Sequence, residues 1–193
     1  MTKEEILQEI SQTLNKSKAD KLASLSANTE DIKQFLVLTF YPEKEIAFRC
    51  AWILENVYFK NPSNFLPLLD EFISAYSLQK NMSCQRHFTK MMMDITSPDN
   101  KLYPLAVETG NDFEAVAETT FEWLINPRTP IAVQANCLDI LFNFSGRYEW
   151  IKDELVSQTE FLLKNGSAAI QSRGNRVLAK LNRFSFQRKE TDS

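Results

Sequence analysis

Glycine is scarce in this 193-residue chain, which contains four glycines and seven prolines. These two residue types form most of the tight turns that join neighbouring β-strands, and an all-β protein of this length needs many such turns. The composition therefore argues against an all-β fold. The length favours one domain with a full hydrophobic core.

Histidine occurs once, as His87, and cysteine occurs at positions 50, 84 and 137. One histidine does not support a catalytic triad, the cysteines lack the close paired spacing of zinc ligands, and no glycine-rich phosphate-binding loop is present. We therefore predict no catalytic residue, no metal and no cofactor. Cys84 lies three residues before His87, so a thiol–histidine contact stays open, although burial of His87 in the core is the favoured interpretation.

Long apolar runs are absent too, since no segment approaches the roughly 18 apolar residues that span a bilayer. The first ten residues, MTKEEILQEI, carry acids where a secretory signal has an apolar block. An odd number of widely spaced cysteines suits a reducing compartment. We expect a cytoplasmic protein that does not contact a membrane.

Apolar residues recur with the period of an α-helix almost throughout the chain. One stripe, at i, i+4, i+7, i+8 and i+11, consists of Ile46, Cys50, Ile53, Leu54 and Val57. Ser167 is expected to cap a helix, as is Thr129, which precedes Pro130 at the first helical position. No stretch alternates convincingly with a period of two residues, so the predicted fold class is all-α.

The segment CAWILEN at residues 50–56 has a counterpart 87 residues later, CLDILFN at residues 137–143. Two further segments align with them when His87 and Gly174 take the place of the cysteines. The isoleucine and leucine columns then read Ile53, Lys90, Ile140 and Val177, and Leu54, Met91, Leu141 and Leu178. We expect these columns, with Lys90 as the exception, to form a buried seam between stacked helix pairs, and the small residue before them to let the helices approach.

The aligned segments lie 37, 50 and 37 residues apart, which is the spacing of helix-pair repeats in α-solenoids. The predicted second helices lie near residues 43–59, 82–95, 130–145 and 167–183, with an inserted loop at about 96–112 that has room for one short helix. The prediction is a single helical-repeat domain at 1–184, followed by a flexible tail at 185–193.

The segment AWILENV resembles the second helix of a HEAT or armadillo repeat, V-R-x-x-A-A-W-A-L-G-N-L. The matching residues are Ala51, Trp52, Leu54, Asn56 and Val57, while Ala47 stands where the family has arginine. The resemblance covers roughly residues 43–184. It implies a right-handed α-α superhelix of about four helix pairs plus N-terminal helices, with the second helices lining a concave face. Short helical chains of about this length have also been classed with adenylosuccinate lyase, but the loop S-S-x-M-P-x-K-x-N of that enzyme is absent.

Positive charge is concentrated near the end of a chain whose net charge is −3. From residue 161 to 189 there are seven lysines or arginines and no acid. Arg173, Arg176, Lys180 and Arg183 lie on one helical stripe away from the apolar residues. This stripe either binds phosphate or an acidic partner, or is a solvated cap whose cations suit a helix C-terminus, which is the favoured interpretation.

The preferred function is a non-enzymatic scaffold that binds another protein, through equivalent positions on the second helices. The candidate binding residues are Arg49, Trp52, Asn56, Arg86, Lys90, Asn136, Asn143, Arg173, Arg176 and Lys180. The alternative is a HEAT-like enzyme of the DNA glycosylase type that grips phosphate with the last helix, although the net negative charge disfavours nucleic acid. A structural subunit of a homo-oligomer is a third possibility. For Trp52 and Trp150, the sequence fits both a place in the core and a place on the contact surface.

Overall fold

The computed structural model describes residues 2–12, 14–25, 28–108, 110 and 113–191, with the surroundings of side chains as far as Arg183. Helices joined by short turns make up these ranges, and no strand occurs in them. The predicted all-α class is confirmed. In the same ranges, no helix combines the length and the apolar character that a membrane span requires.

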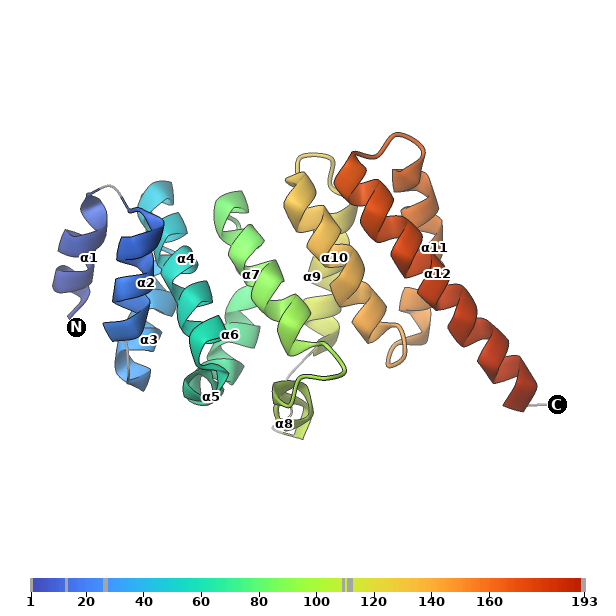
Figure 1. Ribbon diagram of the computed structural model, residues 1–193, viewed down its shortest axis with the longest axis horizontal. Coiled ribbons are helices and arrows are strands. Elements are labelled where there is room, and N and C mark those ends of the chain that lie inside the picture. The colour runs from blue at the N-terminus through green and yellow to red at the C-terminus, as the bar shows by residue number, and fades with distance from the viewer. Residues whose placement is uncertain (1, 13, 26–27, 109, 111–112, 192–193) are drawn as a thin grey trace. The chain divides into compact units, whose positions relative to one another are not determined.

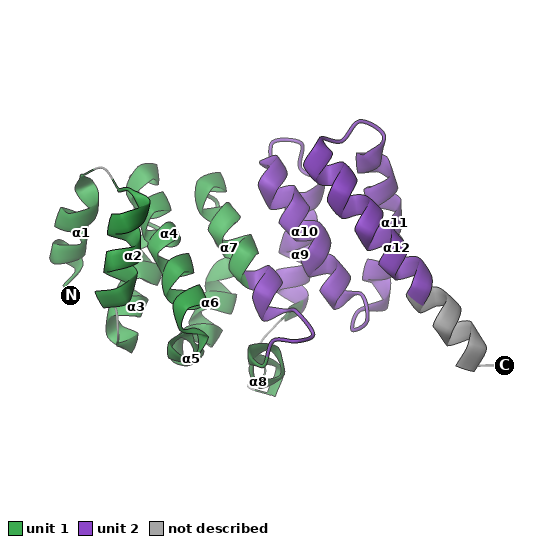
Figure 2. Ribbon diagram, viewed as in Figure 1, with its two compact units in different colours: residues 1–91, 101–113 green, residues 92–100, 114–193 purple. Residues whose placement is uncertain are grey.

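The chain divides into two compact units (Figure 2). Unit 1 comprises residues 1–91 and 101–113, and unit 2 comprises residues 92–100 and 114–193. The single domain predicted at 1–184 thus contains two compact parts. Each part has buried apolar residues of its own.

Unit 1 holds the helices from the N-terminus to most of α7, together with α8 (Figure 1). Local sequence signals start several of them. Thr2 and Glu5 form a capping box at the start of α1, Asn28 accepts the Asp31 backbone N–H at α3, and Pro62 occupies the first turn of α5. The elements are α1 (Lys3–Ser11), α2 (Lys16–Leu25), α3 (Thr29–Leu38), α4 (Lys44–Lys60), α5 (Pro62–Phe65), the 3-10 helix η1 (Leu66–Leu68), α6 (Leu69–Tyr76), α7 (Met82–Ile95) and α8 (Leu102–Glu108).

Aromatic rings join four helices in the core of unit 1. Tyr58 of α4 lies 5.3 Å from Phe65 of α5, measured between ring centroids, and Phe65 lies 5.4 Å from Phe72 of α6. Phe72 in turn lies 5.0 Å from Phe88 of α7. All four side chains are fully buried. Such edge and tilted contacts add to the energy of burial, so the rings fix α4, α5, α6 and α7 together.

Unit 2 contains four further helices and the C-terminal end of α7. They are α9 (Phe113–Ile125, its first residue in unit 1), α10 (Ile131–Phe144), α11 (Glu149–Leu163) and α12 (Ala168–Thr191). Ser167 caps α12, since its Oγ accepts the Ile170 backbone N–H at 3.5 Å. The expected cap at Thr129 is wrong by one residue, because α10 begins at Ile131 with Pro130 in the cap position. The carbonyl of Pro130 starts the helical hydrogen bonding by accepting the N–H of Val133.

The end of α12 does not coincide with the predicted start of the tail. The helix continues past residue 184 to Thr191, and residues 192–193 lie outside the described residues. The flexibility expected for 185–193 stays a prediction. The short helix allowed within the inserted segment corresponds to α8.

The seam predicted from the Ile-Leu columns is buried in each unit. Six of the eight side chains are buried: Ile53, Leu54, Met91, Ile140, Leu141 and Val177. Lys90 is exposed and Leu178 is half-buried. The preceding column of small residues is buried too, and at Gly174 an added Cβ would lie 3.0 Å from Cγ2 of Thr159. Gly174 therefore allows the close approach of α11 and α12.

Truncation of the seam should destabilise the protein. Leu54→Ala in unit 1 and Leu141→Ala in unit 2 each leave a cavity at a fully buried site, and each should lower the free energy of unfolding by about 2–5 kcal/mol. Urea denaturation followed by circular dichroism measures the loss. Leu78→Ala, at a side chain that is 66% exposed, is the control and should change stability by less than about 0.5 kcal/mol. Equal effects at all three positions would contradict the buried seam.

Candidate functional site

Glu55 is the centre of a polar cluster where α4 and α7 face each other in unit 1. The residue is 7% exposed, and its carboxylate accepts hydrogen bonds from Nδ1 of His87 at 2.6 Å and from the ammonium group of Lys90. Burial by itself would raise the pKa of Glu55, but the hydrogen bonds and charges of His87 and Lys90 outweigh burial and lower that pKa. The ionised carboxylate therefore joins α4 to α7.

Lys90 departs from the apolar seam because its charge has partners elsewhere. About half of its side chain is exposed, and Nζ pairs with Glu55 and lies 4.8 Å from the centroid of the Phe59 ring. Phe59 is itself 41% exposed. Lys90 thus presents a cation at the surface and places its ammonium group over an aromatic face.

His87 is packed between α4 side chains and does not contact a reactive thiol. Its ring lies 5.3 Å from that of Phe48, and its Nε2 is buried without a hydrogen-bond partner among the described residues. The Sγ of Cys84 instead lies 3.8 Å from the carbonyl oxygen of Thr39, and burial raises the pKa of this thiol to about 12. The favoured interpretation of His87 as a packed residue agrees with this geometry, and the thiol–histidine alternative has no support from it.

Arg49 fastens α4 to the end of α1. Its guanidinium donates to the backbone carbonyls of Ile10 at 2.6 Å, Ser11 at 3.1 Å and Gln12 at 2.8 Å, and it also pairs with Glu45. Carbonyls at a helix C-terminus lack helical partners and carry partial negative charge, so the arginine satisfies them. Arg49 is engaged within the repeat stack and is not available as the free contact residue that the sequence suggested.

The other three candidates in unit 1 differ in exposure. Arg86 is exposed, with no ion pair to any residue that the structure describes. Trp52 is half-buried, with its ring stacked 6.3 Å from Phe48, so it flanks the core and also reaches the surface. Asn56 is half-buried, and its Nδ2 has no hydrogen-bond partner in the described part of the chain.

Asp139 occupies the corresponding place in unit 2, where α10 faces α12. It pairs with the guanidinium groups of both Arg173 and Arg176, the latter at 2.8 Å. Lys180 lies one turn beyond Arg176, with Nζ 5.0 Å from the centroid of the Phe142 ring. Three of the predicted binding residues, Arg173, Arg176 and Lys180, are therefore brought together on one face.

The two asparagine candidates of unit 2 have structural surroundings. The Nδ2 of Asn143 donates to the Met93 carbonyl at 3.3 Å and to the Thr96 hydroxyl at 3.1 Å, and so joins α10 to the end of α7. Asn136 is buried, with 9% of its surface exposed. A partner protein would not reach Asn136 on this surface.

Helix pairs that stack on a buried seam are typical of helical repeat proteins. A family model described as HEAT repeat domain matches residues 6–181. The chain belongs to the HEAT repeat domain family. It is also similar to the crystal structure of an engineered protein, with 13% identity over 94% of this chain and 99% of that chain and a TM-score of 0.49. No protein of curated function matches it.

Both units of this HEAT repeat chain share a polar pattern that the sequence interpretation missed. In each, one acid on a second helix meets two basic groups from the next: Glu55 with His87 and Lys90, and Asp139 with Arg173 and Arg176. The signal was visible, because Glu55 directly follows the apolar run CAWIL and lies in the same predicted helix. The partners could not be found without knowing which helices are neighbours.

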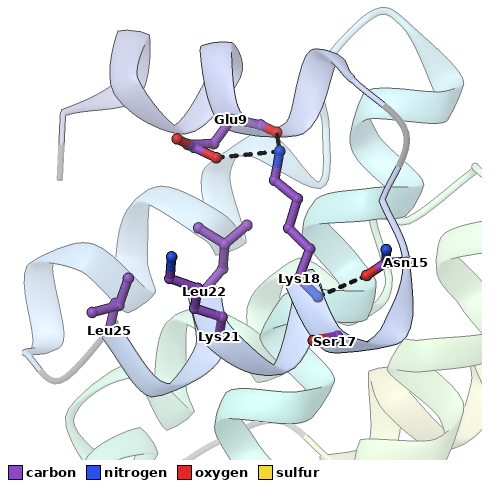
Figure 3. A pocket seen from close by; sticks show the side chains of 7 residues that line it. All are labelled: Glu9, Asn15, Ser17, Lys18, Lys21, Leu22 and Leu25. Atoms are coloured by element: carbon purple, nitrogen blue, oxygen red, sulfur yellow. Dashed lines mark hydrogen bonds and ion pairs between the residues drawn. The ribbon is translucent and has the colours of Figure 1, made fainter.

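A cavity of about 400 Å³ lies between α1 and α2 (Figure 3). Lys18, one of the two lysines that line it, reaches from α2 to the backbone carbonyl and the carboxylate of Glu9 on α1. Leu22 and Leu25 line the same cavity. Since Lys18 is engaged by Glu9, the contact serves to hold the two helices together. In the described residues no three His, Cys, Asp or Glu side chains gather as metal ligands.

Removal of the Glu55 carboxylate should change how stability depends on pH. A carboxyl group whose pKa is lowered by folding stabilises the protein above its unfolded value near 4.5, and this stabilisation is lost as the pH falls. Glu55→Gln should therefore lower the free energy of unfolding by about 1–3 kcal/mol at pH 7. As the pH falls from 7 to 4, the free energy of unfolding of the variant should decrease less than that of wild type. Urea denaturation at several pH values measures both effects.

The control for this experiment is Glu71→Gln, which removes an exposed carboxylate that pairs with Lys33. An exposed pair contributes little, so its stability should stay within about 0.5 kcal/mol of wild type. If Glu55→Gln matched Glu71→Gln at every pH, the structural role of Glu55 would be wrong.

Arg49 and Arg86 occupy equivalent positions but should respond differently to the same substitution. Arg49→Met removes the hydrogen-bond donors to the carbonyls at the end of α1. The free energy of local opening of α1 should therefore fall by about 1–3 kcal/mol, so that its amides exchange faster with solvent, while α4 amides stay protected. Arg86→Met should leave α1 exchange unchanged because Arg86 is exposed. Hydrogen exchange measured by mass spectrometry distinguishes the two, and equal α1 exchange in both variants would argue against the cap.

Proposed function

We propose that this HEAT repeat chain is a non-enzymatic scaffold and that it binds an acidic segment of another protein. The cationic face of α12, made of Arg176, Lys180 and Arg183, is the surface that supports this proposal best. All three side chains are exposed. Repeat proteins of helix pairs present extended surfaces built from equivalent helices, and such surfaces commonly bind other macromolecules.

An imbalance of charge carries the proposal. Among the described residues, Asp139 is the one acid that forms an ion pair with α12, and it is shared by Arg173 and Arg176. No acid occurs between residues 161 and 189, whereas seven lysines or arginines do. Asp139 thus orients two guanidinium groups and leaves net positive charge, which attracts and orients an acidic partner.

Unit 1 offers a second set of contact residues for the same function. Arg86 and Lys90 supply exposed cations on α7, and Trp52 supplies a half-buried ring on α4. Tryptophan and arginine are common at the energetic centres of protein interfaces. We include Asn56 with this set. A cytoplasmic location is part of the proposal, since the three cysteines are free and buried, as suits a reducing compartment.

A nucleic-acid-acting enzyme is the alternative, and the observation that favours it is the exposed cations Arg176, Lys180 and Arg183 on α12, which could grip phosphate. An enzyme of this kind needs the phosphate backbone for affinity, so its binding must weaken steeply as salt is added. A scaffold for an acidic protein would not select duplex DNA over the protein.

The test reverses two charges on α12. Arg176→Glu with Lys180→Glu should reduce capture of partner proteins from a native lysate by about tenfold, which corresponds to roughly 1.4 kcal/mol of binding free energy. Quantitative mass spectrometry of the captured proteins measures the change. Lys80→Glu is the control, because it reverses an exposed charge that precedes α7 and does not belong to α12, and it should capture the same proteins as wild type.

Two outcomes would contradict the scaffold proposal. One is an identical set of captured proteins, in equal amounts, for wild type and the α12 variant. The other is tight binding of duplex DNA by the wild type at low salt that falls steeply with added salt and is abolished by the α12 substitutions, because this result identifies the nucleic-acid alternative.

A further inference from the structure

A groove of about 500 Å³ on unit 2 has the opposite chemistry to α12. It lies along α9 and the start of α11 and is lined by Glu114, Glu118, Phe121, Glu122, Ile125 and Trp150. Three carboxylates and three large apolar side chains therefore share one depression. None of these residues belongs to the seam or to the cationic face of α12.

Two of the acidic residues of the groove, Glu118 and Glu122, are unfavourable for the helix that carries them. Glu114, Glu118 and Glu122 lie one turn apart on α9, where like charges repel each other. Glu122 is in the last turn, next to the negative end of the helix dipole. No cation pairs with Glu118 or Glu122 in the part of the chain that the structure describes. The described part of unit 2 thus contains no ion pair that would offset the repulsion at Glu118 and Glu122.

Two of the three apolar residues of the groove are exposed to solvent, and the third, Phe121, is half-buried. Ile125 is 51% exposed and Trp150 is 41% exposed. The Trp150 ring packs against Phe121 of α9, with 6.0 Å between the ring centroids. Phe121 therefore positions the Trp150 ring at the groove. Exposed apolar residues beside charged ones are typical of interaction sites, and tryptophan often contributes the largest share of binding energy.

We propose that this groove binds a cationic amphipathic helix of a partner protein. The distance along α9 from Glu114 to Ile125 is about 16 Å, or three helical turns, at 1.5 Å per residue. Lysines or arginines one turn apart on the partner would meet the three carboxylates. A bulky apolar side chain beside them would cover Trp150 and Ile125, as in other complexes in which a helix lies in a groove.

Two other possible occupants match the groove less well, because each lacks one of the two required features, positive charge and a large apolar side chain. The α12 helix of a second copy would bring cations, but its described exposed side chains include no large apolar one. Nucleic acid would be repelled by the carboxylates. The proposal is independent of an acidic partner at α12, because it concerns other helices and the opposite charge.

Binding of a labelled synthetic helix to the full-length protein tests the proposal. The probe carries three lysines one turn apart with a leucine beside each, and fluorescence anisotropy reports its binding. Glu118→Lys with Glu122→Lys should weaken binding at least tenfold, and so should Trp150→Ala. The control, Glu30→Lys with Glu160→Lys, makes the same change of charge at exposed acids outside the groove and should bind like wild type.

A second probe and a stability measurement complete the test. A probe with alanine in place of leucine should bind at least tenfold more weakly, because charge attraction alone does not fill the groove. Glu118→Gln with Glu122→Gln should weaken probe binding while Tm stays equal or rises, since it relieves like-charge repulsion. A lower Tm in this variant would mean that the carboxylates are structural and would overturn the proposal.

Three further results would also overturn it. The first is no binding of the leucine probe to wild type at millimolar concentration. The second is equal binding of that probe by wild type and the Glu118→Lys, Glu122→Lys variant. The third is a wild-type oligomer in sedimentation that these two substitutions dissociate, which would assign the groove to a second copy of the chain.

Discussion

A helix pair cannot bury its apolar stripe by itself, and the rest of this structure depends on how that stripe is covered. Within unit 1, α4 packs against α1, α2, α3 and α5, and its Ile53 and Leu54 are fully buried. Within unit 2, α10 packs against α11 and α12, and its Ile140 and Leu141 are fully buried. Repetition of similar residues in the sequence follows from repetition of this contact, because each pair must offer its neighbour a compatible surface.

The same stacking brings charged residues together at the border of the seam. Glu55 on α4 meets two basic groups of α7, and Asp139 on α10 meets two of α12. Removal of water from such pairs offsets much of their attraction, so they define which helices pair more than they add to stability. In unit 1 the buried carboxylate of Glu55 is fully engaged by its two basic partners. In unit 2 the single carboxylate of Asp139 leaves other cations of α12 exposed. A partner can therefore contact only those polar side chains that do not form ion pairs between neighbouring helices.

The sequence predicted much of the fold because helical period and repeat spacing are local properties of the chain. The second helices and the mostly buried Ile-Leu columns could be derived from spacing, and the exception at Lys90 from its charge. The candidate site was harder to predict. Arg49 and Arg86 are equivalent in the alignment, yet Arg49 caps α1 and Arg86 is exposed, because only Arg49 has a helix end beside it. Asn136 looked like a surface residue and is buried. The acidic groove was missed because it joins α9 to Trp150 of α11, and the sequence does not reveal that contact.

The central claim is that α4 and α10 are the helices around which the two units are stabilised. Native-state hydrogen exchange, resolved by residue with NMR, tests it most directly. If the claim is right, the amides of α4 and α10 exchange only with the free energy of global unfolding, while those of α1 and α8 open more easily. If the amides of α4 or α10 exchanged as readily as those of α1 and α8, the seam would not hold the repeats together and the account would be contradicted.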